Sequence, residues 1–269
     1  MSTHLDDALS ALTAVAEEAG TLAHSRYGAV QAGDVSYKSE VDLVTTTDYE
    51  IETLLRDRLS ARFPDAIFVG EESGADDADY LSAARAFVVD PLDGTANFVH
   101  GIPYYSISLA LIEEGEVRAG VVAAPELGAV YAARHGGGAF RNGVPITVST
   151  REPLTSALAS TGFAAVRYRV KPDNMALFAH MAYLIRGIRR FGSAAIDLCY
   201  VADGRIDLFW EYGLHDWDVA AGALILREAG GRVSTISGEE RVLGAGNILG
   251  TNGRVHREFL DQASQIPQH

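Results

Sequence analysis

Acidic residues follow an apolar run in the segment 86–95, which reads Ala-Phe-Val-Val-Asp-Pro-Leu-Asp-Gly-Thr. The run predicts a strand that delivers Asp90 at its end, because the proline that follows lacks an N–H and cannot extend a ladder of hydrogen bonds. Gly94 permits an unusual turn angle, so the turn can bring Asp90, Asp93 and the Leu92 carbonyl to one side. Three converging hard oxygens are typical of Mg²⁺ sites. The segment therefore predicts a metal site.

The same turn offers backbone donors for an anion. The N–H groups of Gly94 and Thr95 would be available to hold a phosphate beside the metal. An ordinary turn is the alternative, because Asp-x-x-Asp-Gly is common at strand ends, and this segment alone leaves both interpretations open.

A second short apolar run ends in acids at Gly70-Glu71-Glu72-Ser73. Adjacent carboxylates on an extended segment point to opposite sides, so one of them faces a given site. We assign Glu71 to the metal site and place Glu72 at its edge. Two solvated loop acids are the alternative for this segment.

Three further candidates occupy positions that usually have a structural role. Asp218 stands at a predicted helix N-terminus, which is typical of an N-cap. Asp48 lies in the first turn of a helix that we expect to begin at Thr47 with the capping box Thr47-x-x-Glu50. Lys38, taken alone, is an ordinary surface residue.

The charge of the chain limits its partners. The 269 residues include 36 acidic and 22 basic side chains, a net charge of −14 that repels nucleic acids and anionic lipids unless a cation intervenes. Half of that charge lies between Asp65 and Asp93, where eight acids face one arginine. Within this stretch Asp76, Asp77 and Asp79 are typical of a solvated acidic loop. We expect no nucleic-acid and no membrane partner.

Composition and the chain start predict a soluble cytoplasmic protein. Cys199 is the one cysteine, which excludes an internal disulfide and a cysteine-based zinc site and fits a reducing compartment. Residues 1–10 carry acids where a signal peptide carries positive charge, and no run of about 18 apolar residues exists.

Periodicity predicts an α+β half followed by an α/β half. The first half combines helices at about 3–27 and 47–63 with strands at 66–69 and 86–89, an antiparallel meander over 107–133, and an Asn142-Gly143 hairpin before a strand at 146–148. The second alternates strands at 157–161, 187–191, 206–210 and 232–235 with helices at 174–186, 194–202 and 219–229. We place the seam near 149–153, which divides the chain into 1–150 and 151–269.

Together these segments resemble the inositol monophosphatase family. The matching segments, in the order the family has them, are 41–48, Gly70-Glu71-Glu72-Ser73, Asp90-Pro91-Leu92-Asp93-Gly94-Thr95-Ala96-Asn97-Phe98, Gly192-Ser193-Ala194-Ala195, Glu211, and Trp217-Asp218-Val219-Ala220-Ala221-Gly222. They cover nearly the whole chain. The resemblance implies a layered αβαβα sandwich of the inositol monophosphatase and fructose-1,6-bisphosphatase type, and commonly a homodimer.

The resemblance also implies an activity: hydrolysis of a phosphate monoester with two or three Mg²⁺ ions, usually inhibited by Li⁺. Motif matching assigns one metal to Glu71, Asp90 and the Leu92 carbonyl, a second to Asp90, Asp93 and Asp218, and a third to Glu71. Thr95, oriented by Asp48 and assisted by Glu71, would position or deprotonate the attacking water. Lys38 would lie at the edge of the metal site. Substrate contacts are implied for Asp93, Gly94, Thr95, Gly192, Ser193, Ala194, Glu211 and Asp218, with Glu211 accepting from polyol hydroxyls.

Several alternatives stay open at this point. Members of the family cleave histidinol phosphate, fructose 1,6-bisphosphate, 3′-phosphoadenosine phosphates or NADP, although Asn97-Phe98-Val99-His100 and Glu211 favour an inositol phosphate. Haloacid-dehalogenase phosphatases use Asp-x-Asp-Gly-Thr, but Asp90 and Asp93 are three apart and do not share a strand face. A non-catalytic regulatory protein is the last alternative, and its expected mark would be the loss of metal acids that are all present here.

Overall fold

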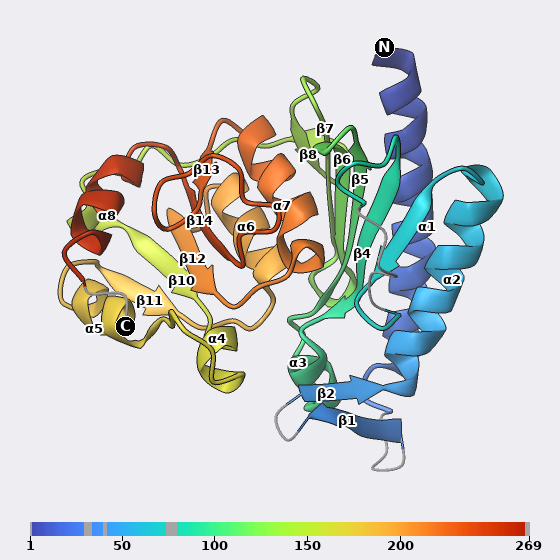
Figure 1. Ribbon diagram of the computed structural model, residues 1–269, viewed down its shortest axis with the longest axis horizontal. Helices are drawn as coiled ribbons and strands as arrows, with labels where there is room; N and C mark the ends of the chain where they lie inside the picture. Colours follow the sequence, from blue (N-terminus) through green and yellow to red (C-terminus); the bar gives the residue numbers. More distant parts are fainter. Residues whose placement is uncertain (1, 30–33, 40–41, 74–79, 267–269) are drawn as a thin grey trace.

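Five layers of helices and sheets make up the computed structural model, which describes residues 2–29, 34–39, 42–73 and 80–266. Figure 1 shows them side by side as a helix pair, a seven-stranded sheet, a helix pair, a five-stranded sheet and an outer helix pair. The three pairs are α1 (Ser2–Arg26) and α2 (Thr46–Arg62), α6 (Ala194–Ala202) and α7 (Asp216–Glu228), and α5 (Met175–Ala182) and α8 (His256–Ala263). The predicted αβαβα sandwich is confirmed.

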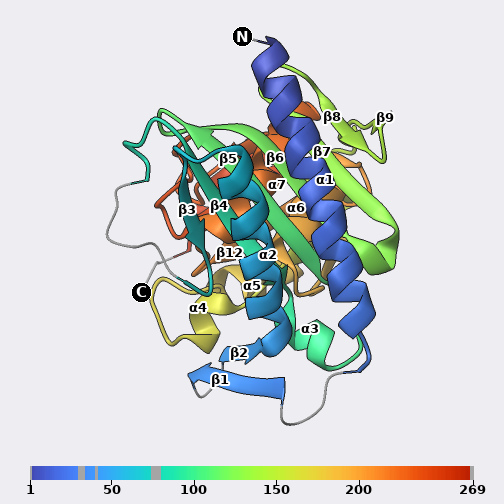
Figure 2. The ribbon, with the colours of Figure 1, turned by 90° about the vertical axis from the view of Figure 1, so that its right-hand side faces the viewer.

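The seven-stranded sheet is built from the first part of the chain. Its strands are β3 (Ile67–Gly70), β4 (Ala86–Asp93), β5 (Ser106–Glu113), β6 (Glu116–Ala124), β7 (Ala129–Arg134), β8 (Ala139–Arg141) and β9 (Val144–Pro145). They lie in sequence order, with β3 and β4 parallel and all later neighbours antiparallel, so the predicted meander is confirmed. Figure 2 shows α1 and α2 lying across the outer face of this sheet.

The five-stranded sheet is built from the later part of the chain. Its order is β11 (Gly187–Arg189), β10 (Leu158–Thr161), β12 (Leu208–Tyr212), β14 (Asn247–Thr251) and β13 (Arg232–Ser234). Strand β10 is parallel to β11 and β12, whereas β14 is antiparallel to both of its neighbours. Because β9 ends at Pro145 and β10 begins at Leu158, the sheets separate close to the predicted seam. The division into two domains there stays a prediction.

Short strands and helices connect the larger elements. Strands β1 (Val35–Ser39) and β2 (Asp42–Thr45) form an antiparallel pair ahead of α2. Helices α3 (Thr95–Val99) and α4 (Ala164–Arg167) follow β4 and β10. Among the described helices, none combines the length and the apolar character that crossing a membrane requires.

Both faces of each sheet are covered, which explains the continuous apolar runs in the sequence. In β4, Phe87 and Val89 pack against α1 and α2, while Val88 points to the opposite face and packs with α6 and α7. In β12, Phe209 joins the cluster of α6 and α7, while Trp210 packs with α5 and α8. All five side chains are buried. The two sheets are therefore held at fixed positions on either side of α6 and α7.

Helix α2 begins one residue before the predicted start and uses a different capping box. Thr45 is the N-cap, and the Asp48 carboxylate accepts the Thr45 N–H at 2.8 Å. The predicted box of Thr47 and Glu50 is therefore wrong. Two residue pairs, Thr45 with Asp48 and Thr47 with Glu50, have the i, i+3 spacing of a capping box. Because β2 ends at Thr45, the helix begins directly after it and the first pair forms the cap.

Two strand predictions also need correction. Strand β4 continues through the proline at 91 to Asp93, because a register shift against β5 between Asp90 and Asp93 accommodates a residue without an N–H. The Asn142-Gly143 turn has positive φ at both residues, as a type I′ turn requires, but the strand after it is β9 and not 146–148. Strand β14 and helix α8 are elements that the sequence did not predict.

Candidate active site

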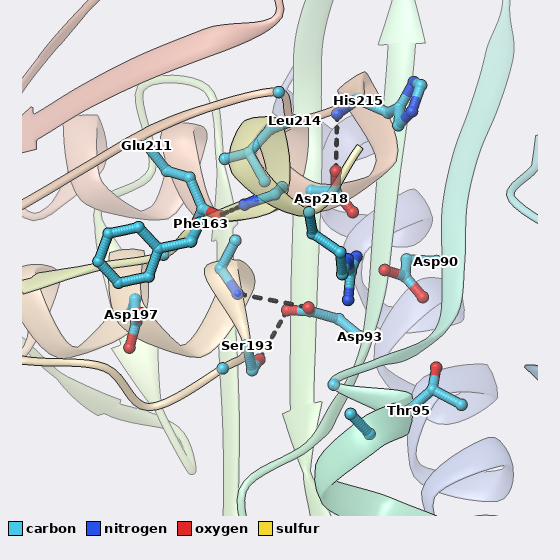
Figure 3. A pocket seen from close by; sticks show the side chains of 18 of the residues that line it. Asp90, Asp93, Thr95, Phe163, Ser193, Asp197, Glu211, Leu214, His215 and Asp218 are labelled. Atoms are coloured by element: carbon cyan, nitrogen blue, oxygen red, sulfur yellow. Dashed lines mark hydrogen bonds between the residues drawn. The ribbon is translucent and has the colours of Figure 1, made fainter. Parts of the chain in front are cut away.

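A cavity of about 250 Å³ opens where β4, β10 and β12 end near the first turns of α6 and α7 (Figure 3). Both sheets and the helices between them contribute to its walls. Most of the predicted site residues line it, namely Glu71, Asp90, Leu92, Asp93, Gly94, Thr95, Gly192, Ser193, Ala194, Glu211 and Asp218. Segments from distant parts of the sequence therefore meet at one place.

The end of β4 and the turn that follows it point their oxygen atoms into this cavity. Asp90 is 1% exposed, and its Oδ1 accepts the N–H of Leu92 at 2.8 Å, which fixes its rotamer. Thr95 Oγ1 lies 3.0 Å from the Leu92 carbonyl oxygen. Gly94 has φ of 100°, and a Cβ there would meet the carbonyl oxygen of Tyr104 at 3.0 Å. Only glycine allows this turn without strain.

Asp93 connects the first sheet to helix α6. Its Oδ2 accepts the Ser193 hydroxyl at 2.6 Å and the Ala195 N–H at 2.8 Å, and its Oδ1 accepts the Ala194 N–H at 3.3 Å. These groups form the N-terminus of α6, which favours a negative charge. The Asp93 carboxylate therefore holds α6 against the turn after β4.

Asp48 and Asp218 occupy the third position of their helices and use one oxygen for the local cap. Asp48 Oδ2 accepts the Thr45 N–H, and Asp218 Oδ2 accepts the His215 N–H at 2.6 Å. The other oxygen of Asp48, Oδ1, accepts the Thr95 hydroxyl at 3.2 Å. The structural interpretation of Asp48 is therefore correct, and it is compatible with contact to the site because the two oxygens have different partners.

The acids of the cavity raise one another's pKa values. Burial raises the pKa of Asp90 well above its usual range, and the nearby charges of Glu71, Asp93 and Asp218 add to the shift. The pKa of Asp218 rises for the same two reasons. Burial raises the pKa of Asp93 to about 6, although the hydrogen bonds from Ser193 and the α6 backbone act in the opposite direction. An added cation would offset this repulsion.

The donor set of the cavity fits Mg²⁺. Carboxylate and carbonyl oxygens are the ligands that hard divalent cations prefer, and Figure 3 shows Asp90, Asp93 and Asp218 around the same part of the cavity. Among the described residues, no group of three or more acidic, histidine or cysteine side chains is already arranged closely enough to hold a metal ion. Ionised acids repel one another, so a cation would be needed to bring them closer.

The opposite wall carries a single buried glutamate. Glu211 is 6% exposed, and its Oε1 accepts the Ala164 N–H at 2.9 Å. A Cβ at Gly162 would overlap this carboxylate, so glycine leaves the space that Glu211 occupies. Burial raises the pKa of Glu211 to about 7, while the charges of Arg190 and Arg167 act to lower it.

Two wall residues, Asp197 and Arg190, were not singled out from the sequence, whereas Arg167 belongs to the stretch 162–169, whose basic residues were interpreted as contacts to substrate or to a second subunit. Asp197, in the first turn of α6, is 2% exposed and accepts the Tyr104 hydroxyl at 2.8 Å. Arg190 and Arg167 also line the cavity and bring positive charge close to Glu211. A lone acid inside the apolar helix segment Ala-Ala-Ile-Asp-Leu-Cys was the available signal for Asp197. Arg190 had no comparable signal, because basic residues in loops are common.

Three predicted residues are not part of the described cavity wall. Asp48 lies behind Thr95 and contacts the cavity only through it. Glu72 does not line the cavity, and its N–H is bound by Glu52. The side chain of Lys38 lies outside the described part of the chain, as do the loop acids of 74–79.

Comparison with known proteins agrees with this architecture. The sequence profile described as inositol monophosphatase family matches residues 4–268. The inositol-1-monophosphatase of Mesorhizobium japonicum is 37% identical over 252 residues, which cover 94% of each chain. The putative Nus factor SuhB of Neisseria meningitidis serogroup B is 39% identical over 245 residues, which cover 91% of this chain and 93% of that one.

A solved structure extends the agreement to three dimensions. The inositol monophosphatase of Anabaena (Nostoc) sp. PCC 7120 matches with a TM-score of 0.87 and 34% identity, and the match covers 98% of both chains. Sequence, profile and fold agree over almost the entire length. This chain therefore belongs to the inositol monophosphatase family.

Proposed function

We propose that this protein is a Mg²⁺-dependent phosphate monoester hydrolase whose preferred substrate is an inositol phosphate such as myo-inositol 1-phosphate. The observation that supports the proposal is the convergence of four acids, Glu71, Asp90, Asp93 and Asp218, on one cavity whose opposite wall carries Glu211. A dianionic phosphate could not approach these acids without cations. The polyol part of the substrate would face Glu211, whose carboxylate accepts hydrogen bonds.

The acids divide into two sets around the phosphate position. Glu71, Asp90 and the Leu92 carbonyl would hold one Mg²⁺, and Asp90, Asp93 and Asp218 a second, with Glu71 available for a third. Bound Mg²⁺ would lower the pKa of water and offset charge on the leaving oxygen. The protein contributes acids whose rotamers are already fixed by backbone N–H groups at Leu92, Ala195 and His215.

Thr95 and Asp48 would orient the attacking water. The Thr95 hydroxyl has one proton and lies within reach of both Asp48 Oδ1 and the Leu92 carbonyl, so its oxygen can accept a hydrogen bond from water in the cavity. Burial raises the pKa of Asp48 to about 6, although the Thr45 hydroxyl and N–H act to lower it. Above that pH Asp48 is ionised and can take the proton that Thr95 passes on.

Glu211 would recognise the alcohol part of the substrate. One of its oxygens already accepts the Ala164 N–H, and the carboxylate faces the cavity. A carboxylate can accept from two vicinal hydroxyls, which suits a polyol. Phosphate esters of polyols should therefore bind better than simple alkyl phosphates.

Substitution of Thr95 tests the water-orienting role. Thr95→Val keeps the shape but removes the hydroxyl, and we expect kcat to fall roughly 100-fold, within the range of general acid–base catalysis. Thr95→Ser should recover most of the activity because it restores the hydroxyl. Equal losses in both variants, measured at saturating Mg²⁺ and substrate, would remove the hydroxyl from the mechanism.

A panel assay tests the function itself. Phosphate release should require Mg²⁺, should be lost on chelation and be inhibited by Li⁺, and should be fastest for myo-inositol 1-phosphate among inositol, histidinol, sugar, adenosine 3′- and NADP phosphates. No release from any of them would refute the enzyme and favour a regulatory role. Trapping of a phospho-aspartate would favour the aspartyl-phosphate mechanism instead.

The proposal includes the homodimer that the resemblance implies and the cellular setting that composition and charge predict. We propose a cytoplasmic homodimer with no nucleic-acid or membrane partner. Sedimentation at micromolar concentration would report a mass near 57 kDa for a dimer, twice the 28.7 kDa of the chain.

A further inference from the structure

One face of α2 contacts both segments that carry the proposed water-handling groups. Asp48, Glu52 and Arg56 are spaced four residues apart, so they lie one above the other on the same face of the helix. Asp48 holds Thr95, as described above. Glu52 and Arg56 contact the segment 68–73, which carries Glu71.

Glu52 binds the turn that follows β3 with its carboxylate. The Glu71 N–H donates to the Val89 carbonyl at 3.2 Å and continues the ladder to β4. Glu72 lies in the turn that follows β3, so its N–H is not part of the β3–β4 ladder. There Glu52 Oε2 accepts it at 2.8 Å. The two bonds fix the peptide groups on both sides of Glu71 and hence the direction of its side chain.

Gly70 makes this close approach sterically possible. A Cβ at position 70 would overlap the Glu52 carboxylate, which occupies the space of the missing side chain. Glu52 is 5% exposed, so the contact is buried. A buried carboxylate that accepts a backbone N–H forms a strong, charge-assisted hydrogen bond.

Arg56 completes the contact from the next turn of α2. Its guanidinium donates to the Ser73 hydroxyl at 2.5 Å and lies 3.4 Å from Glu52 Oε1. The same group lies over the ring of Phe68, 4.3 Å from its centroid. Arg56 therefore balances the charge of Glu52 and binds both ends of the segment 68–73.

We propose that Glu52 is a positioning residue that, with support from Arg56, holds Glu71 in the cavity at a set distance from Thr95. Because Asp48 and Glu52 are one turn apart on a rigid helix, about 6 Å along its axis, α2 fixes the two groups relative to each other. The inference rests on the proposed function, in which Glu71 and Thr95 act on the same water.

Two substitutions separate hydrogen-bond geometry from charge. Glu52→Gln keeps the length and one acceptor oxygen but loses the charge, whereas Glu52→Asp keeps the charge but is one methylene too short to reach the Glu72 N–H. We expect Glu52→Gln to keep most of the wild-type kcat and Glu52→Asp to lose roughly 10- to 100-fold, as outer-shell partners of metal ligands do. The opposite order would overturn the proposal.

Two further measurements do not depend on turnover. In the metal-free protein, amide hydrogen exchange at Glu72 should stay slow in Glu52→Gln and become at least roughly tenfold faster in Glu52→Asp. Calorimetric titration with Mg²⁺ should show weaker binding in Glu52→Asp alone. Unchanged exchange and Mg²⁺ affinity in Glu52→Asp would overturn the proposal. If the exchange rate and the Mg²⁺ affinity change as expected but the protein hydrolyses no phosphate ester, the proposed function is refuted and the positioning role of Glu52 stands.

Control variants guard against a general loss of stability. Glu50→Gln lies on the same helix with a 44% exposed side chain paired to Arg26, and it should leave kcat and the Glu72 exchange rate unchanged. Gly70→Ala should reproduce the loss of kcat. In the double variant with Glu52→Asp, the combined loss of kcat should be smaller than the sum of the two single effects on a logarithmic scale, because the shorter acid leaves room for the new methyl group. Fully additive losses would contradict the shared contact.

Discussion

Asp93→Asn is expected to lower kcat by roughly 100- to 10,000-fold. The reason is that a bound metal ion lowers the energy of the charged transition state by several kcal/mol, and Asp93 is a proposed ligand of that ion. The substitution removes the negative charge that both the second proposed cation and the N-terminus of α6 face. It keeps the size of the side chain. Measurement of kcat at saturating Mg²⁺ and substrate distinguishes this loss from weaker binding.

The fold should survive the same substitution. The amide oxygen of the Asp93→Asn variant can still accept the Ser193 hydroxyl and the Ala195 N–H, and only the long contact to Ala194 is lost. Loss of a buried charge whose pKa is raised to about 6 acts in the stabilising direction. We expect the free energy of unfolding of the metal-free protein to change by about 1 kcal/mol or less.

Asp207→Asn provides the contrasting control for Asp93. Asp207 is also buried but does not line the cavity, and it accepts hydrogen bonds from Arg151 and the Leu158 N–H. Its substitution should lower thermal stability and leave kcat near the wild-type value. A turnover rate for Asp93→Asn that equals that of Asp207→Asn would remove Asp93 from the site.

Glu211→Gln should make the metal-free protein more stable at pH 8 and less active on polyol phosphates. Burial raises the pKa of Glu211 from 4.5 to about 7, so the folded protein binds more protons than the unfolded chain between these values. The stability contribution of this acid therefore decreases as the pH rises from 4.5 to 7. Above pH 7 the ionised Glu211 lowers the free energy of unfolding by roughly 3 kcal/mol. Glutamine carries no charge and avoids this loss, although its hydrogen bond from the Ala164 N–H is weaker.

Thermal unfolding in the presence of a chelator measures this effect. The Glu211→Gln variant should unfold several degrees above the wild type at pH 8 and at about the same temperature at pH 4.5. Glu17→Gln, an exposed residue of α1, should show no such dependence. A Glu211→Gln variant that is less stable than the wild type at both pH values would contradict the assignment. Activity should fall for myo-inositol 1-phosphate more than for a phosphate without vicinal hydroxyls.

Local patterns were enough to predict the parts of the site that depend on a single segment. The apolar run before Asp90 predicts a buried strand, and the acids and glycine after it predict an oxygen-rich turn, because backbone geometry within about ten residues controls both. The strands of the meander followed from β-branched runs and turn residues. The segment 86–95 alone predicted a Mg²⁺ site, whereas the assignment of individual residues to each metal and to the substrate came from the family resemblance.

The start of α2 shows where local patterns stop being sufficient. The segment 45–50 satisfies the capping pattern for both Thr45 with Asp48 and Thr47 with Glu50. Propensity cannot choose between them, since each pair has the right spacing. The packing of β2 and the hydrogen bond from Thr95 to Asp48 make the first arrangement the stable one.

The amino-acid sequence is sufficient to define which segments end in acids and which glycines allow tight turns, because these properties depend on neighbours along the chain. The partners of those acids are a property of the fold. Asp93 at the N-terminus of α6, Arg190 beside Glu211, and Glu52 against Gly70 are contacts between segments that are distant in sequence. Such contacts exist only after layers of helices and sheets pack, since packing of the three apolar clusters places those segments side by side.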